Sequence, residues 1–159
     1  MVLSFPDLAQ CAKSGKKIIM ASLFAKIASG EIPAIILYED SHTLAFLDIG
    51  PASRGHTLVI PRDEYADLYA MPPELLAAVM ATVQRVATAL RDTLAPDGLN
   101  VVQNNGVAAG QTVFHYHVHL IPRWAGDDVI QPWQVQQLSQ DELQAIAEQV
   151  RAAIVSPTV

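Results

Sequence analysis

The chain has 159 residues, the length of one ordinary domain, and is long enough to bury a hydrophobic core. Apolar residues make up 51% and charged residues 16% of it, which excludes an intrinsically disordered chain. Ten Lys and Arg against sixteen Asp and Glu give a net charge of −6, which argues against a broad basic surface for nucleic acid. The apolar runs are too short to span a bilayer. We therefore expect neither nucleic acid nor a membrane as a partner, and an anionic ligand would need a local cluster of donors.

The N-terminal residues and the single cysteine bear on where the protein acts. Residues 1–20 place three lysines before an apolar stretch that is too brief for a signal peptide and lacks a convincing cleavage site. We interpret residues 1–20 as an N-terminal extension and residues 21–159 as one domain. Cys11 alone excludes an internal disulfide framework and the multi-cysteine zinc motifs, which favours a cytoplasmic protein.

The first half of this domain predicts a short helix followed by three strands. Ser22 is a suitable N-cap, Gly30 is a suitable stop, and Pro33 prevents the helix from continuing. Residues rich in β-branched, aromatic and aliphatic side chains then predict strands at 35–38, 42–47 and 55–60. The first two form a predicted hairpin, because polar turn residues separate them.

The second half predicts a long helix, two strands and a last helix. The long helix follows Pro73 and has apolar residues at helical spacing from Leu76 to Leu94. The two strands are 99–103 and 113–121, with the loop 104–112 between them. The last helix begins with a capping box of Ser139 and Glu142, and its apolar stripe ends at Ile154. Successive strands interrupted by one long helix predict an α+β fold, a five-stranded antiparallel sheet with helices on one side.

Three of the five histidines stand at alternate positions, His115, His117 and His119. In a strand such side chains share one face, so the rings would line one surface at steps of roughly 6–7 Å. The residues that alternate with them are predicted to point into the core: Phe114, Tyr116, Val118 and Leu120. Two kinds of chemistry fit three imidazoles on one face. They can chelate zinc with the help of further ligands, or one neutral ring can attack phosphorus while its neighbours donate hydrogen bonds.

The loop 104–112 helps to choose between these two kinds of chemistry. It offers amide donors, a hydroxyl and glycines, and it contains no carboxylate or thiol. Such a loop suits a phosphate better than a divalent metal, although the same residue types also serve as plain turn formers.

Residues 115–121, with Gln111 ahead of them, resemble the signature of the histidine triad (HIT) nucleotide-binding family. The resemblance covers about residues 22–124. Further segments similar to the N-terminal half of the family are 24–27, 30–33, 38–40, 45–49 and 55–61.

The resemblance implies a nucleotide hydrolase or transferase that acts at the α-phosphate through a nucleotidyl-histidine intermediate, with no cofactor. By motif position His117 is the nucleophile, and its other ring nitrogen donates to the main-chain carbonyl of His115. His119 would bond the phosphate and the leaving group and help to protonate the latter. His56 would support the triad from behind.

The resemblance also implies a nucleoside pocket. Asp48 would accept hydrogen bonds from the ribose hydroxyls. An aspartate at this position is equally consistent with a turn residue that has no contact with a ligand. The residues implied to wall the base, each of which also fits a core position, are Leu23, Phe24, Ile27, Phe46 and Ile49. Those implied to contact the phosphate are Asn104, Gln111, Thr112 and the amide of Val113.

One departure from the family bears on metal binding. Many bacterial members carry a Cys-x-x-Cys before the first helix that binds a structural zinc with a hairpin histidine and one near the triad. Ser22 and Ala25 occupy those positions here, so we expect no metal and interpret His42 as an ordinary surface histidine.

We therefore expect a metal-independent purine nucleoside phosphoramidase or a related nucleotide hydrolase with an AMP- or GMP-type ligand. A dinucleoside polyphosphate hydrolase, a nucleotide-binding regulatory protein with vestigial turnover and a zinc-dependent hydrolase remain alternatives. Family members are usually homodimers, and the apolar stripe 76–94 fits a dimer as well as it fits burial in one subunit.

Overall fold

The computed structural model describes residues 21–130 and 135–155, and the chain divides into two compact units after Val129. The interpretation of residues 1–20 as an extension, and Cys11 with it, lies outside the described residues. The single domain from residue 21 to the end stays a prediction.

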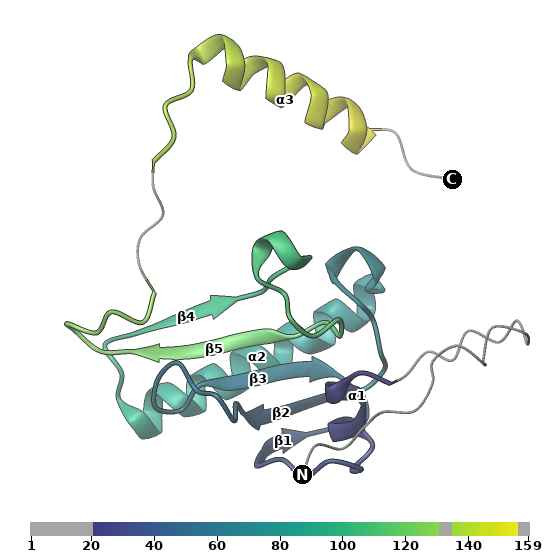
Figure 1. The fold of residues 1–159 in the computed structure, drawn as a ribbon, viewed down its shortest axis with the longest axis vertical. Helices are drawn as coiled ribbons and strands as arrows, with labels where there is room; N and C mark the ends of the chain where they lie inside the picture. The colour runs from purple at the N-terminus through teal and green to yellow at the C-terminus, as the bar shows by residue number, and fades with distance from the viewer. Residues whose placement is uncertain (1–20, 131–134, 156–159) are drawn as a thin grey trace, which may run out of the picture. The chain divides into compact units, whose positions relative to one another are not determined.

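The first unit contains an antiparallel sheet of five strands, as the sequence predicts (Figure 1). The strand order is β1-β2-β3-β5-β4, so the last strand in sequence lies between β3 and β4. The strands are β1 (Ile36–Glu39), β2 (Thr43–Leu47), β3 (Thr57–Pro61), β4 (Gly98–Val102) and β5 (Val118–Arg123). Two short 3-10 helices, η1 (Leu68–Ala70) and η2 (Val107–Ala109), lie in the connections before the long helix and before β5.

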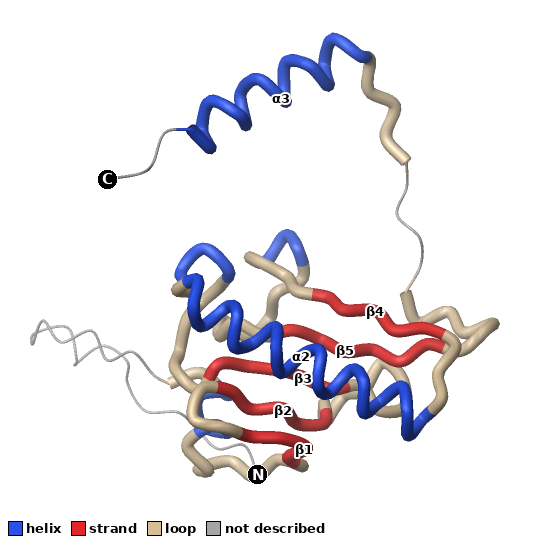
Figure 2. Tube along the Cα trace, turned by 180° about the vertical axis from the view of Figure 1, so that it is seen from behind, coloured by secondary structure: helices blue, strands red, loops and turns tan. Residues whose placement is uncertain are grey.

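The long helix α2 (Pro73–Leu94) covers one face of this sheet (Figure 2). Pro73 at its first turn has a φ suited to the helix, and Ala95 ends the helix in the left-handed conformation with φ of 47°. The buried residues of α2 that join the core with strand residues such as Val59 and Leu120 are Val79, Val83, Val86 and Leu90. The apolar stripe is thus largely buried against the chain's own sheet.

The short helix α1 (Leu23–Ala28) packs on the other face of the sheet. Its Phe24 joins a second cluster with Leu44, Phe46, Leu58 and Ile60, which alternate along β2 and β3 with the residues that face α2. The expectation that the helices share one side is therefore wrong, because both faces are covered.

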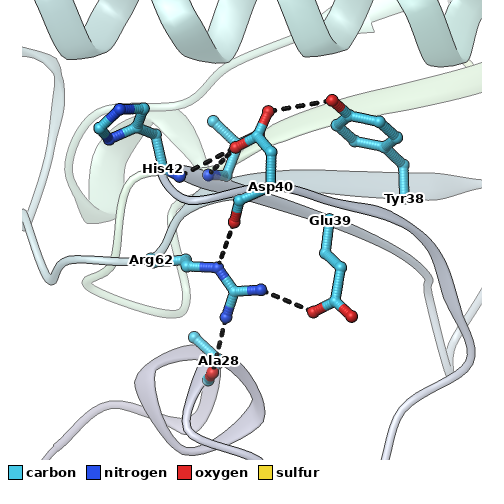
Figure 3. A network of polar contacts seen from close by, with 7 residues as sticks. Ala28, Tyr38, Glu39, Asp40, His42 and Arg62 are labelled. Carbon is cyan, nitrogen blue, oxygen red and sulfur yellow. Dashed lines mark hydrogen bonds and ion pairs between the residues drawn. The ribbon is translucent and has the colours of Figure 1, made fainter.

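Arg62 links α1 to the β1–β2 hairpin (Figure 3). Its guanidinium donates to the main-chain oxygens of Ala28 (3.2 Å) and Asp40 (2.6 Å) and to the carboxylate of Glu39 (2.6 Å). His42 enters this network through its backbone N–H, which donates to Asp40 Oδ1 at 2.9 Å. The C-terminal end of α1 is thereby fixed to the edge of the sheet.

The strand predicted at 113–121 is wrong at its N-terminal end, because β5 begins at Val118. Residues 113–115 make bends, and residues 116–117 also lie outside the ladder. Phe114, predicted in the core, is 51% exposed, whereas Tyr116, Val118 and Leu120 are buried as predicted.

The second unit contains α3 (Gln140–Val155), which begins at the predicted capping box. Ser139 N–H donates to Glu142 Oε2 at 2.8 Å, and Glu142 N–H donates to Ser139 Oγ at 3.3 Å. Its apolar stripe, which includes Leu143 and Ile154, is exposed within this unit. No helix in the described part of the chain has both the length and the apolar character needed to cross a membrane.

Gly55, in the turn before β3, has φ of +84°, and a Cβ there would overlap Leu94 Cδ1. We expect Gly55→Ala to lower the free energy of unfolding by about 2–3 kcal/mol, because a left-handed alanine is strained and the contact with α2 would be overpacked. Gly30 has φ of +80° with nothing within 4 Å of its Cβ position, so Gly30→Ala should cost only about 1 kcal/mol. Urea denaturation measures both losses, and equal losses would contradict the close packing of this turn on α2.

Candidate functional site

Hydrogen bonds outside the ladder of the sheet hold the segment 113–117. The His115 ring is fully buried, and its Nε2 lies 2.9 Å from the main-chain oxygen of Pro61. Tyr116 N–H donates to the main-chain oxygen of Tyr65 at 2.6 Å. β5 begins only at Val118, and these bonds stand in place of ladder bonds before it, so the prediction of three histidines in one strand is corrected. His119 lies in β5, while His115 and His117 precede it.

The hydrogen bond of His117 determines which of its ring nitrogens carries the proton. Its Nδ1 lies 2.6 Å from the main-chain oxygen of His115. A carbonyl oxygen only accepts, so Nδ1 must carry the proton and Nε2 of the neutral ring keeps a lone pair. The sequence-based expectation for this bond agrees with the geometry.

The proton positions on His56 and His119 follow from a backbone N–H group. Ala52 N–H donates to His56 Nδ1 at 3.0 Å, so the neutral His56 ring carries its proton on Nε2. His56 Nε2 in turn lies 2.9 Å from His119 Nδ1, which must accept. His119 therefore carries its own proton on Nε2. Its ring centroid lies 4.9 Å from that of His117, so a lone-pair nitrogen and an N–H nitrogen belong to adjacent rings.

Burial keeps these rings neutral. It lowers the pKa of His56, of His115 and of His117 below the usual 6.5. Burial together with the neighbouring His117 and His56 lowers the pKa of His119 to about 4, against the opposing effect of Asp48. A bound anion would favour the charged form and raise these pKa values.

Asp48 makes the turn contact that the sequence leaves open for it, and its contact with a ribose stays a prediction. Its Oδ1 accepts the N–H of Gly50 at 2.8 Å, which is a turn contact, and its Oδ2 lies 3.7 Å from His56 Nε2. Among the described residues, Asp48, His56 and His119 offer ligand atoms within 4.8 Å of one another and could hold a metal ion. Binding of a metal by His56 Nε2 would displace its hydrogen bond to His119. The expectation of no metal stays a prediction.

A hollow of about 370 Å³ opens beside Asp48 and His56. A larger hollow of about 520 Å³ is lined by α2 and the β1–β2 end, including Leu37, Arg54 and Leu90, and no histidine lines it. We place the candidate site at the histidine cluster, whose His56 and the neighbouring Asp48 line the smaller hollow.

The residues predicted to wall a base divide into two groups. Phe24 is buried, with its ring centroid 5.0 Å from that of His117 and 5.7 Å from that of Phe46. Ile27 is half-buried in the same cluster. Leu23 is 48% exposed and Ile49 is fully exposed, so the structure does not bring these two into the wall.

Gln111, predicted to contact the phosphate, is buried and bonded within the chain. Its Oε1 accepts Gly106 N–H at 2.7 Å, and its Nε2 donates to the main-chain oxygens of Ala66 (2.6 Å) and Val113 (3.1 Å). Its amide therefore shapes the loop before the triad. Asn104 and Val113 are half-buried and Thr112 is exposed, and their contact with a phosphate stays a prediction.

Sequence reasoning missed the groups that hold the histidine rings in place. The main-chain groups of Ala52 and Pro61 bond the rings of His56 and His115, and that of Tyr65 bonds the backbone of Tyr116. A backbone group carries no signal in the residue type. The sequence predicts Ser22 as a helix cap and as a replaced metal position, but it does not predict the contact of its hydroxyl with His115.

Comparisons with known proteins agree with this geometry. The family model described as the HIT domain matches residues 29–126. The chain is 48% identical over 106 residues to "Protein hit" of Bacillus subtilis, covering 67% of this chain and 73% of that protein. It is 37% identical over 136 residues to adenosine 5'-monophosphoramidase hnt1 of Schizosaccharomyces pombe, covering 85% and 99%. A crystal structure of a HIT family member from Bacillus subtilis matches with a TM-score of 0.78 and 40% identity over 82% of this chain and 95% of that one.

The lowered histidine pKa values predict how stability depends on pH. The unfolded chain binds protons on these histidines below a pKa of about 6.5, whereas folded His119 binds one only near pH 4. The free energy of unfolding should therefore fall by about 1–3 kcal/mol as the pH drops from 6.5 toward 4, and these groups should change it little above pH 7. Urea denaturation at a series of pH values measures this dependence. His119→Asn keeps an acceptor at the Nδ1 position and should flatten the curve, and an unchanged slope would contradict the assignment.

Proposed function

This chain belongs to the HIT domain family, and we propose that it hydrolyses a nucleoside phosphoramidate or a related nucleoside phosphate derivative at the α-phosphorus. One observation carries the proposal, namely the pair of Nε2 atoms on His117 and His119. The first has a lone pair and the second a proton, and the two rings are adjacent. Attack on phosphorus and protonation of a leaving group need this combination.

In the first step His117 Nε2 forms a bond to the α-phosphorus and the bond from phosphorus to the leaving nitrogen breaks. The nitrogen of a simple phosphoramidate leaves as ammonia after gaining one proton. We assign the delivery of that proton to the His119 Nε2–H, and the attacking water of the second step returns it. The His115 carbonyl, bonded to His117 Nδ1–H, stabilises the positive charge that develops on the attacking ring.

In the second step a water oxygen bonds to phosphorus and the bond from phosphorus to His117 Nε2 breaks. The nucleoside monophosphate leaves, and the proton that the water gives up returns to His119 Nε2, which restores the starting state. Imidazole groups supply every proton transfer and the nucleophile, so the proposal needs neither a metal nor a cofactor.

The nucleoside half of the proposal rests on Asp48 and the apolar cluster around Phe24. The carboxylate of Asp48 is 19% exposed, and it can accept hydrogen bonds from vicinal hydroxyls. The name of the fission yeast relative, an adenosine 5'-monophosphoramidase, supports an AMP-type ligand. We also propose that the protein acts in the cytoplasm.

A homodimer is also proposed, on the resemblance to the family alone. The stripe of α2 that fits a dimer is largely buried in this protomer, although Met80 on α2 and Val101 on β4 are about half exposed. A sedimentation experiment measures the oligomeric state directly.

The catalytic proposal is tested with chelator-treated protein and adenosine 5'-phosphoramidate. We expect the wild type to release AMP and His117→Ala to release at least a thousandfold less, because the nucleophile is gone. His42→Ala is the matched control, since His42 lies outside the site, and it should keep wild-type turnover. No release by the wild type would contradict the proposal and favour a dinucleoside polyphosphate hydrolase or nucleotide binding without turnover.

Asp48→Asn tests the assignment of the ribose contact. The amide oxygen can keep the turn bond to Gly50 while the charge is lost. We expect KM for a ribonucleoside phosphoramidate to rise about tenfold with a smaller change in kcat, because hydrogen bonds to a charged acceptor are the stronger ones. A 2',3'-dideoxy substrate should be affected much less by the substitution, and an equal effect on both substrates would contradict the ribose contact.

A further inference from the structure

Ser22, the N-cap of α1, makes hydrogen bonds in three directions. Its Oγ accepts the N–H of Ala25 at 3.1 Å, which caps the helix. The same Oγ lies 3.0 Å from His115 Nδ1, and its backbone N–H donates to Glu64 Oε1 at 2.9 Å. One residue thus connects α1, the triad segment and the chain that follows β3.

The direction of the Ser22–His115 bond follows from the other side of the ring. His115 Nε2 donates to the Pro61 carbonyl, so Nδ1 of the neutral ring is an acceptor. The hydroxyl proton of Ser22 therefore points to Nδ1. His115 is fully buried, so water does not replace this donor at low cost if the hydroxyl is lost.

The orientation of His115 matters for the ring beside it. The main-chain oxygen of His115 accepts the Nδ1–H of His117 at 2.6 Å. Residues 113–117 lie outside the sheet ladder, so the position of that oxygen depends on what holds the His115 side chain and its neighbours. The His115 ring is held on one side by Pro61 and on the other by Ser22.

The same helix also places a wall against the attacking ring. Phe24, two residues after Ser22, has its ring centroid 5.0 Å from that of His117 and 6.2 Å from that of His115. A shift of the start of α1 would move this aromatic ring as well as the hydrogen bond. A change at Ser22 would therefore affect His117 both through His115 and through Phe24.

We infer that the Ser22 hydroxyl is a positioning group for the reaction, which holds His115 so that its carbonyl fixes the proton and the orientation of His117. The part of this inference that concerns turnover rests on the proposed function. The part that concerns the rings does not.

Ser22→Gly separates this role from helix capping, because glycine caps a helix nearly as well as serine and has no hydroxyl. Ser22→Thr keeps a hydroxyl at this position. Ser29→Ala removes an exposed hydroxyl at the other end of α1 and is the matched control. Circular dichroism and urea denaturation establish that each variant is folded.

Nitrogen-15 NMR of the histidine rings is the primary measurement. In Ser22→Gly we expect the His115 Nδ1 signal to shift and the His117 Nδ1–H proton to exchange with water about tenfold faster, while Ser22→Thr and Ser29→Ala match the wild type. With adenosine 5'-phosphoramidate, kcat of Ser22→Gly should fall about tenfold with KM within twofold.

A folded Ser22→Gly with wild-type His117 signals would overturn the inference, and so would an altered signal with unchanged kcat. If no variant and no wild type releases AMP, the proposed function fails. The His117 exchange rate then still decides whether Ser22 positions the ring.

Discussion

A neutral imidazole has one donor nitrogen and one acceptor nitrogen, and in this protein backbone groups decide which is which. The carbonyls of Pro61 and His115 each require a proton on the ring nitrogen that faces them, and the N–H of Ala52 requires a lone pair. Burial lowers the pKa of these rings, so protonation does not relax these requirements near neutral pH. Two Nε2 atoms of opposite character on adjacent rings are the result, and the proposed reaction depends on that difference.

The sheet supplies the rigid frame for these bonds. β3 pairs with β5 so that Leu58 lies opposite His119, which brings His56, directly before β3, to the side of the same ring. The turn that holds Ala52 and His56 packs through Gly55 against Leu94 of α2. The helix on one face thus supports the turn that fixes the protons on the other face, and α1 with Phe24 covers the histidines there.

Much of this fold could be predicted from the residue pattern, and part of the site could not. The five strands and the long helix follow from hydrophobic periodicity and turn residues, which report on burial, whereas the place of β5 between β3 and β4 does not follow from them. The alternation of the three histidines indicates a shared face, but it cannot reveal that the ladder starts only at Val118, because the competing bonds from Tyr65 and Pro61 are backbone groups. Gln111 is an example of a polar residue near a site whose amide is used to shape a loop. Ile49 fits the family pattern and is fully exposed in this chain, which no local rule predicts.

The central claim is that His117 Nε2 forms a covalent bond to phosphorus during turnover. Rapid mixing of the protein with adenosine 5'-phosphoramidate, followed by an alkaline quench and peptide mass spectrometry, tests it most directly, because a phosphorus–nitrogen adduct on histidine survives at high pH. The account predicts an adenylyl group on the peptide that contains His117, localised to that ring. An adduct on another residue, or continued AMP release with no adduct at any mixing time, would contradict it.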